Sequence, residues 1–296
     1  ERLTIFWIDF MVAMPSGSRF IVQPRGRRHR WGSKKEEEPT MQATDVSTRR
    51  DAIAKLSISA PHLALLPAMP AALAPTPPTT QPSGYVDDGS MVSFVAGVNQ
   101  QHQQDALNST LLAQLAANAQ YDRTKDTVNW YKAYAQVLET VGWQVQNFNF
   151  NQFEASGNTF TVDAVVLQLL SSIATQDELA IAKATIDALQ GLDKGDGRLA
   201  LFNSASHPAS NGNFQLAAAV ESNNILMLKV GAFYFYSNET TTDFLWWHYS
   251  SSDTKFWQGG QVMNLNDQVY GQVRQQIIDK LGSHAKTAIQ NLPLKI

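Results

Sequence analysis

The chain has 296 residues, 44% of them hydrophobic, and a formal net charge of −3. This is enough apolar material for a sizeable core. The chain has no cysteine, which excludes disulfides, a thiol nucleophile, a zinc–cysteine site and S-acylation. Residues 1–84 hold 11 basic and 7 acidic residues, whereas residues 85–296 hold 12 and 19. The acidic second part argues against nucleic acid as a partner, because phosphate backbones bind clustered cations.

Residues 1–84 are predicted to be a leader outside the folded body. Ten of the 12 prolines lie at or before Pro82. The segment 41–74 has a polar start, the pair Arg49 and Arg50, a mildly apolar stretch and an end rich in small residues. It resembles a twin-arginine export signal of bacteria, which implies an exported protein. The alternative is a disordered, basic and proline-rich leader on a cytoplasmic protein.

Periodic apolar residues predict helices after this leader. Leu107, Leu111 and Leu115 repeat every four residues and form one apolar stripe. A helix at 176–190 is expected to begin with a capping box made by Thr175 and Glu178. The other predicted helices are 127–141, 162–173 and 267–281, and glycines at 142 and 282 end two of them.

Alternating and continuous apolar runs predict a block of strands. The stretch 143–153 alternates and then changes phase, which indicates a strand with a bulge near Asn147. The stretch 192–198 is typical of a turn, and 199–202 of a short strand. Further strands are expected at about 213–221, 225–236, 243–249 and 255–265.

The stretch 226–236 is apolar on both faces, and Lys229 is its one charged residue. The aromatic stretch 243–249 is expected to be its partner strand. Strands of this kind belong at the centre of a sheet that is covered on both sides. The sequence therefore predicts, for residues 85–296, a single α/β domain: a three-layer α/β/α sandwich with a mainly antiparallel central sheet.

The order of these elements resembles the Cyt-type cytolytic delta-endotoxins. It is also similar to a family of bacterial virulence proteins with an α/β layered body. The resemblance covers about residues 100–282 and is densest in 211–257. It implies direct binding to a lipid membrane, proteolytic removal of a leader, and insertion of the strands as a homo-oligomer. Two features depart from the pattern, since the chain lacks the lipidated cysteine of the virulence relatives and a clear polar face for a pore.

The residues predicted to contact a lipid or another ligand are aromatic. Trp and Tyr favour the membrane interface, and aromatic side chains also line ligand pockets. The alternative is that they pack in the core of the sandwich. These residues are Trp246, Trp247, Tyr249 and Trp257.

No catalytic, metal or cofactor motif stands out. The histidines at 207, 248 and 284 lack metal-ligand spacing, and no serine lies in a nucleophile-elbow motif. We therefore expect a non-enzyme without a cofactor, namely a membrane-interacting, Cyt-like toxin or virulence-type protein. The alternative is a soluble lipid-binding or small-ligand-binding module, with a pocket lined by Trp246, Trp247 and Trp257. A third hypothesis is an enzyme whose site forms only in three dimensions.

Overall fold

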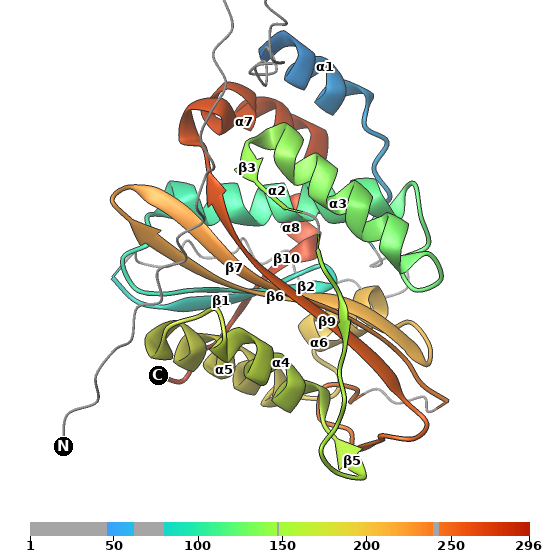
Figure 1. The fold of residues 1–296 in the computed structure, drawn as a ribbon. Helices are drawn as coiled ribbons and strands as arrows, with labels where there is room; N and C mark the ends of the chain where they lie inside the picture. The colour runs from blue at the N-terminus through green and yellow to red at the C-terminus, as the bar shows by residue number, and fades with distance from the viewer. Residues whose placement is uncertain (1–45, 62–79, 147, 239–242) are drawn as a thin grey trace, which may run out of the picture. The chain divides into compact units, whose positions relative to one another are not determined.

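The computed structural model describes residues 46–61, 80–146, 148–238 and 243–296. The elements described below belong to one compact unit, Ala43–Ile296. One large sheet separates two layers of helices in this unit (Figure 1). This arrangement confirms the predicted three-layer α/β/α sandwich, in which each helical layer covers one apolar face of the sheet.

The large sheet has eight strands in the order β10-β1-β2-β6-β7-β9-β3, and β4 also pairs with β9. Neighbouring strands are antiparallel except for β2 and β6, which are parallel. A separate two-stranded sheet joins β5 to β8. The strands are β1 (Ser83–Asp87), β2 (Ser90–Phe94), β3 (Trp143–Gln144), β4 (Asn151–Gln152), β5 (Thr159–Phe160), β6 (Asn211–Ser222), β7 (Ile225–Tyr236), β8 (Tyr249–Ser250), β9 (Lys255–Leu265) and β10 (Ile289–Leu292).

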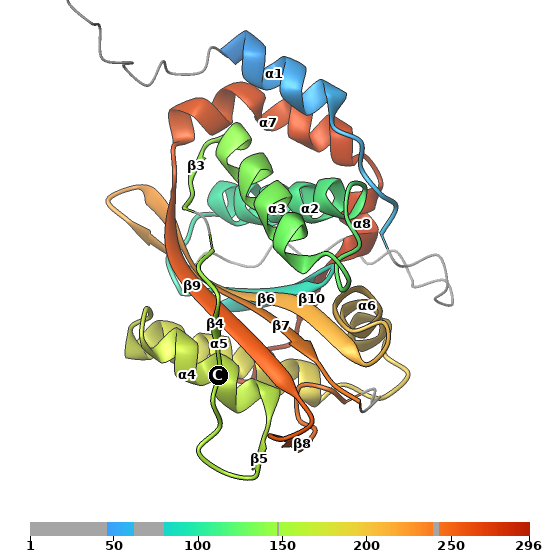
Figure 2. The same ribbon diagram turned by 45° about the vertical axis from the view of Figure 1, so that its right-hand side comes forward.

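The two faces of the sheet are named here as Figure 1 draws them. The upper face packs against α2, α3 and α7, and the lower face against α4, α5 and α6. α1 is the outermost helix of the upper layer and lies over α7 (Figure 2). The helices are α1 (Val46–Lys55), α2 (Gln100–Asn118), α3 (Thr127–Val141), α4 (Val162–Ser171), α5 (Gln176–Gln190), α6 (Gly197–Ser206), α7 (Asp267–Leu281) and α8 (His284–Ala288).

Strand β7 has a hydrophobic core on each side, as its sequence predicts. Leu228 and Val230 belong to the upper core, whereas Phe233 and Phe235 belong to the lower core. Lys229 also faces the lower side, where its Nζ lies 2.6 Å from Oε2 of Glu178 on α5. The ion pair gives this one charged side chain a partner under the helical layer.

Local signals in the sequence place several element ends correctly. Thr175 and Glu178 form the predicted capping box at the start of α5. Gly142 ends α3 with a φ of 117°, a conformation that suits glycine. Asn223 and Asn224 both have positive φ and form the tight turn between β6 and β7.

Two predicted strands adopt another structure. Residues 199–202 lie in α6, because the side chain of Asp196 caps this helix by accepting a hydrogen bond from the backbone of Arg198. Residues 243–248 form a turn, and the partners of β7 are β6 and β9. Phe244 and Leu245 both point into the lower core, which the alternation of a strand does not allow.

The predicted strand 143–153 is present only as two short pieces, β3 and β4. Both pieces pair with β9. The residues between them are outside the regular pairing, and Asn147, the predicted bulge, lies outside the described residues. The change of phase in the sequence therefore marks an interruption of the strand.

Part of the predicted leader belongs to the folded unit. Ile53 of α1 is fully buried in the upper core. The backbone N–H of Ser59 donates to the carbonyl of Leu115 on α2 at 3.0 Å. The structure thus places residues 46–61 against the body, and β1 already begins at Ser83. The remainder of the predicted leader, 1–45 and 62–79, lies outside the described residues.

Candidate functional site

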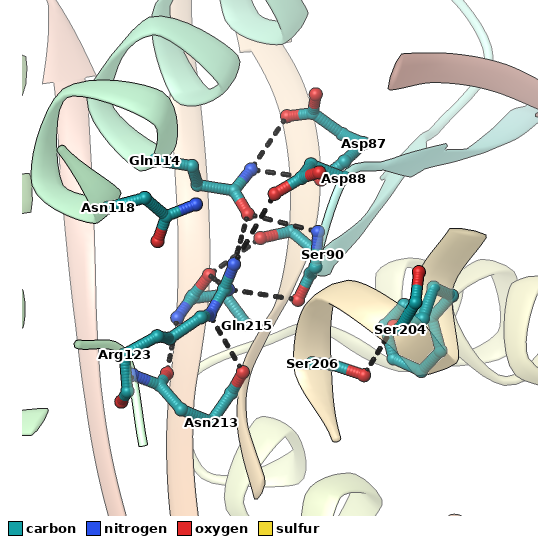
Figure 3. A network of polar contacts seen from close by, with 12 residues as sticks. Asp87, Asp88, Ser90, Gln114, Asn118, Arg123, Ser204, Ser206, Asn213 and Gln215 are labelled. Atoms are coloured by element: carbon teal, nitrogen blue, oxygen red, sulfur yellow. Dashed lines mark hydrogen bonds and ion pairs between the residues drawn. The ribbon is translucent and has the colours of Figure 1, made fainter. Parts of the chain in front are cut away.

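A buried polar network lies between α2, the β1–β2 turn and β6 (Figure 3). At its centre the guanidinium of Arg123 lies 3.5 Å from Oδ2 of Asp88, and both side chains are buried. The guanidinium also donates to four oxygens at distances between 2.9 and 3.2 Å. These oxygens are the backbone carbonyls of Gly89 and Asn213 and the side-chain carbonyls of Gln114 and Gln215.

The turn that carries the two acids needs a glycine. A Cβ on Gly89 would collide with the guanidinium of Arg123. Asp88, just before it, has a φ of 51°, which Asp tolerates better than most residues. The sequence Asp87-Asp88-Gly89 therefore forms a turn that brings one carboxylate to the arginine and the other to α2.

The surroundings of Asp87 favour the uncharged form of its carboxyl group. Oγ1 of Thr110 lies 2.6 Å from Oδ2 of Asp87 and 2.8 Å from the carbonyl of Ala106. A hydroxyl has one proton, so Thr110 can donate to only one of these two oxygens at a time. Burial raises the pKa of Asp87 well above its ordinary value, and the charge of Asp88 adds to this effect. The hydrogen bond from Thr110 and the charge of Arg123 oppose the rise without cancelling it.

This network is sealed from solvent. Asp87 and Asp88 are fully buried, and Arg123 is nearly so. A catalytic group has to reach its substrate, and neither surface pocket described below is lined by these residues. We interpret the network as the polar connection between the sheet and α2 rather than as an active site.

His102 forms a second polar cluster, at the start of α2. Its Nδ1 lies 2.8 Å from Oε2 of Glu221 at the end of β6, and its Nε2 lies 3.0 Å from Oδ2 of Asp267 in α7. Burial alone would lower the pKa of His102, but the hydrogen bonds to both carboxylates outweigh it and raise the pKa. His102 therefore connects α2 to β6 and α7. Both of its ring nitrogens already contact a carboxylate, so neither is placed to accept a proton from a substrate.

The turn 243–248 presents two of the predicted aromatic residues at the surface. Phe244 and Leu245 are buried and anchor the turn in the lower core. The backbone N–H groups of Trp246 and Trp247 both donate to the carbonyl of Asp243, at 2.9 and 3.0 Å. Trp246 is partly buried, whereas Trp247 is 45% exposed.

A surface pocket of about 340 Å³ opens beside this turn. Its walls come from the C-terminal end of α5, the α5–α6 loop, α6 and the turn itself. Two of its lining residues form a loose ion pair, with Nζ of Lys194 3.9 Å from Oδ2 of Asp243. The lining residues are Gln190, Leu192, Lys194, Leu199, Asp243, Trp246 and Trp247.

A second surface pocket has a different character. It has a volume of about 460 Å³ and lies between α3 and the segment after β3. Among the described residues that line it, none is aromatic, in contrast to the first pocket. They are formed by Lys132, Ala135, Gln136, Glu139, Val145 and Gln146.

The other two predicted contact residues, Tyr249 and Trp257, do not line the pocket beside Trp246 and Trp247. Tyr249 is fully buried in the lower core. Trp257 lies on the upper face, where its ring stacks on Tyr234 with centroids 4.9 Å apart. The predicted pocket with three tryptophans is therefore wrong, because Trp257 and Phe256 alternate on β9 and only Phe256 faces the lower side.

The two arginines of the predicted export signal both hold α1 to the body. Arg49 donates to the carbonyls of Glu139 and Thr140 at the end of α3, at 2.8 and 2.7 Å. Arg50 donates to the carbonyl of Gln272 on α7 at 2.8 Å. Glu139 and Thr140 lie in the last turn of α3, where backbone carbonyls favour cationic donors, so Arg49 fits this position.

The polar clusters were not singled out from the sequence, although one signal for the network was present. The letters "YVDDGSMVSF" (85–94) place Asp-Asp-Gly between two apolar runs, which is typical of a hairpin. Arg123 and His102 gave no such signal, because their partners are distant in sequence. Among the described residues, no group of three potential ligands is arranged to hold a metal ion, and no helix has the length and hydropathy to span a membrane.

Comparisons with known proteins add little to this geometry. No model of a known protein family matches the chain, and no curated protein sequence matches it either. Among solved structures, the chain is similar to that of the Evf virulence factor, with a TM-score of 0.32 and 8% sequence identity. The match covers 70% of this chain and 82% of the other. This similarity is too weak to carry an argument about function, so we argue function from the site alone.

Proposed function

We propose that this protein attaches to lipid membranes through the turn 243–248, as a toxin-like or virulence-type protein without catalytic chemistry of its own. The observation that carries the proposal is the exposure of Trp247 beside Trp246 and Lys194. Indole rings favour the membrane–water interface, and a nearby lysine can reach the phosphate layer. The two residues before them, Phe244 and Leu245, are buried and anchor the turn in the lower core.

The proposal assigns no catalytic role to either of the described polar clusters. The acids around Arg123 have no path to a substrate, and His102 has both ring nitrogens engaged. Export through the twin-arginine route and assembly into a homo-oligomer remain further parts of the proposal. Attachment at the surface does not require either helical layer to open.

The test is flotation of the full chain with phospholipid vesicles. Trp247→Ala is expected to lower the bound fraction severalfold, because it removes the ring that enters the interface. Ile225→Ala is the matched control, since Ile225 is 47% exposed at the β6–β7 turn and lies far from the tryptophans in sequence. Equal binding of the Trp247 variant and the wild type would refute attachment through this turn.

A second candidate function is that of a soluble module that binds a lipid or small ligand in the same pocket. The volume of about 340 Å³ favours it, because small-molecule sites begin at about this size and are lined by apolar and aromatic groups with a few polar ones. Vesicle flotation separates the two candidates. A soluble carrier extracts its ligand and stays in solution, whereas a membrane-attached protein floats with the vesicles.

A further inference from the structure

The pocket beside Trp246 and Trp247 offers three features that attract a cation. Indole faces bind ammonium groups, and quaternary ammonium ligands are held by aromatic side chains in particular. Asp243 contributes a carboxylate at the rim. The C-terminal end of α5, at Gln190, carries the negative end of the helix dipole.

Lys194 adds an anion-binding group next to these features. Its side chain is 88% exposed, and Nζ lies 3.9 Å from Oδ2 of Asp243, at the limit of an ion pair. Exposed pairs of this kind contribute little to stability, so Lys194 can turn to another partner at small cost. The rim of the pocket therefore holds one negative and one positive group close together.

We propose, building on the membrane function above, that this pocket binds a zwitterionic phosphocholine-type headgroup. The quaternary ammonium group lies against Trp246 and Trp247 beside Asp243, and the phosphate is directed toward Lys194. Leu192 and Leu199 also line the pocket and offer apolar surface to the methyl groups. The positive and negative groups of the ligand thus each meet a side chain of opposite charge, Asp243 and Lys194.

The same features disfavour the other common headgroups. A purely anionic headgroup would meet Asp243 and the negative end of α5. A primary ammonium is a compact and strongly hydrated charge, so its transfer against indole rings costs more than that of a methylated one. The pocket is therefore expected to prefer choline over ethanolamine and glycerol headgroups.

The first test is calorimetric titration of the full chain with phosphocholine and with choline. Asp243→Asn and Trp247→Leu should each weaken phosphocholine binding by about tenfold, the size of one cation–π or carboxylate contact. Lys194→Gln should weaken phosphocholine but not choline. Asp253→Asn is the control, because Asp253 is an exposed acid outside the pocket. Binding that none of the three pocket variants weakens would overturn the proposal.

The second test separates this inference from the membrane function by using vesicles of phosphatidylcholine, phosphatidylethanolamine and phosphatidylglycerol. Preferential flotation with phosphatidylcholine, displaced by free phosphocholine, supports both. Equal flotation with all three, without displacement, leaves the membrane function and overturns the headgroup site. Phosphocholine binding without any flotation supports the site for a soluble ligand and overturns the membrane function. Neither binding nor flotation overturns both.

Discussion

Asp87 and Asp88 are neighbours in one turn, but their surroundings differ. Asp88 faces the guanidinium of Arg123, whereas Asp87 faces the hydroxyl of Thr110 and the side-chain amide of Gln114. A buried ion needs a counter-ion, and one arginine supplies it for one acid. At this scale, the turn geometry decides which of two identical side chains lies beside the guanidinium.

Asp87→Asn is expected to make the folded protein less sensitive to pH. The pKa of Asp87 is raised in the folded state, so its contribution to stability is complete below the unfolded pKa and is lost as pH rises through the folded pKa. Between the unfolded and the folded pKa of Asp87, the wild type should lose up to about 1.4 kcal/mol of unfolding free energy per pH unit from this group. The variant should lack that loss. Urea unfolding across pH 4–9 measures the difference, with the exposed Asp51→Asn as control.

Asp88→Asn is expected to destabilise the folded protein. It leaves the buried guanidinium of Arg123 without its carboxylate, which costs about 3 kcal/mol in comparable cases. The same urea titrations provide the measurement. If the two variants changed the unfolding free energy equally, the assignment of different roles to Asp87 and Asp88 would be wrong.

At the scale of elements, α1 is held by few contacts. Its one fully buried side chain is Ile53, and its hydrogen bonds to α3 and α7 come mainly from exposed side chains. Elements with little buried apolar surface open at low free-energy cost. α1 is therefore the helix of the upper layer that we expect to detach first.

Ile53→Ala should release α1 without unfolding the body. Truncation of a buried isoleucine costs about 2–5 kcal/mol, which exceeds what the exposed contacts can replace. Hydrogen exchange followed by mass spectrometry should show faster exchange in residues 46–55 and unchanged protection in β6 and β7. Ala54→Ser, on the exposed side of α1, should leave both regions as they are. Loss of protection throughout the chain would mean that α1 is an integral part of the core.

Replacement of Arg49 and Arg50 by lysine tests the export hypothesis. A guanidinium offers several donors in a planar fork, and lysine offers a single ammonium charge. We expect the double substitution to abolish export, as measured by the share of the protein outside the cytoplasm of a bacterial host. Unimpaired export would leave the pair with only its observed role of holding α1 to α3 and α7.

His102→Gln tests the connection between α2, β6 and α7. The two carboxylates raise the pKa of His102 in the folded state. The stabilisation that the protonated ring gives the fold is therefore complete below the ordinary histidine pKa, and it disappears as pH rises through the folded pKa. The wild type should lose stability relative to the variant as the pH rises above about 6.5, the ordinary pKa of histidine. Thermal unfolding over this range gives the difference. A constant difference across the range would show that the histidine is not protonated in the fold.

At the scale of the whole molecule, a large hydrophobic core covers each face of the sheet. Six of the largest fully buried side chains belong to phenylalanines of the lower core: Phe202, Phe214, Phe233, Phe235, Phe244 and Phe256. Exposing these six would cost on the order of 10 kcal/mol. This is comparable with the entire stability of a typical domain.

The sheet should therefore remain covered when the protein binds vesicles. Hydrogen exchange in β6, β7 and β9 is expected to stay slow, and encapsulated dye should stay inside the vesicles. A protein that inserts its strands would instead lose protection in β7 and release the dye together. That result would favour strand insertion over surface attachment.

The sequence by itself determined the layers of this protein. The period of the apolar residues, the capping box at Thr175 and the two-sided apolar character of β7 are local patterns, so they can be read without coordinates. The strand prediction is wrong for 199–202, because the cap at Asp196 starts a helix there. It is also wrong for 243–248, because the adjacent residues Phe244 and Leu245 both pack in the lower core.

Only the tertiary structure decided which side chains meet. It separated Trp257 from Trp246 and Trp247, brought Lys194 to Asp243, and joined Arg123 to Asp88. It also placed α1 against α7, although the composition of that region resembles a leader. The physical reason is that such contacts depend on the direction of each side chain and on partners distant in the chain, neither of which has a local pattern.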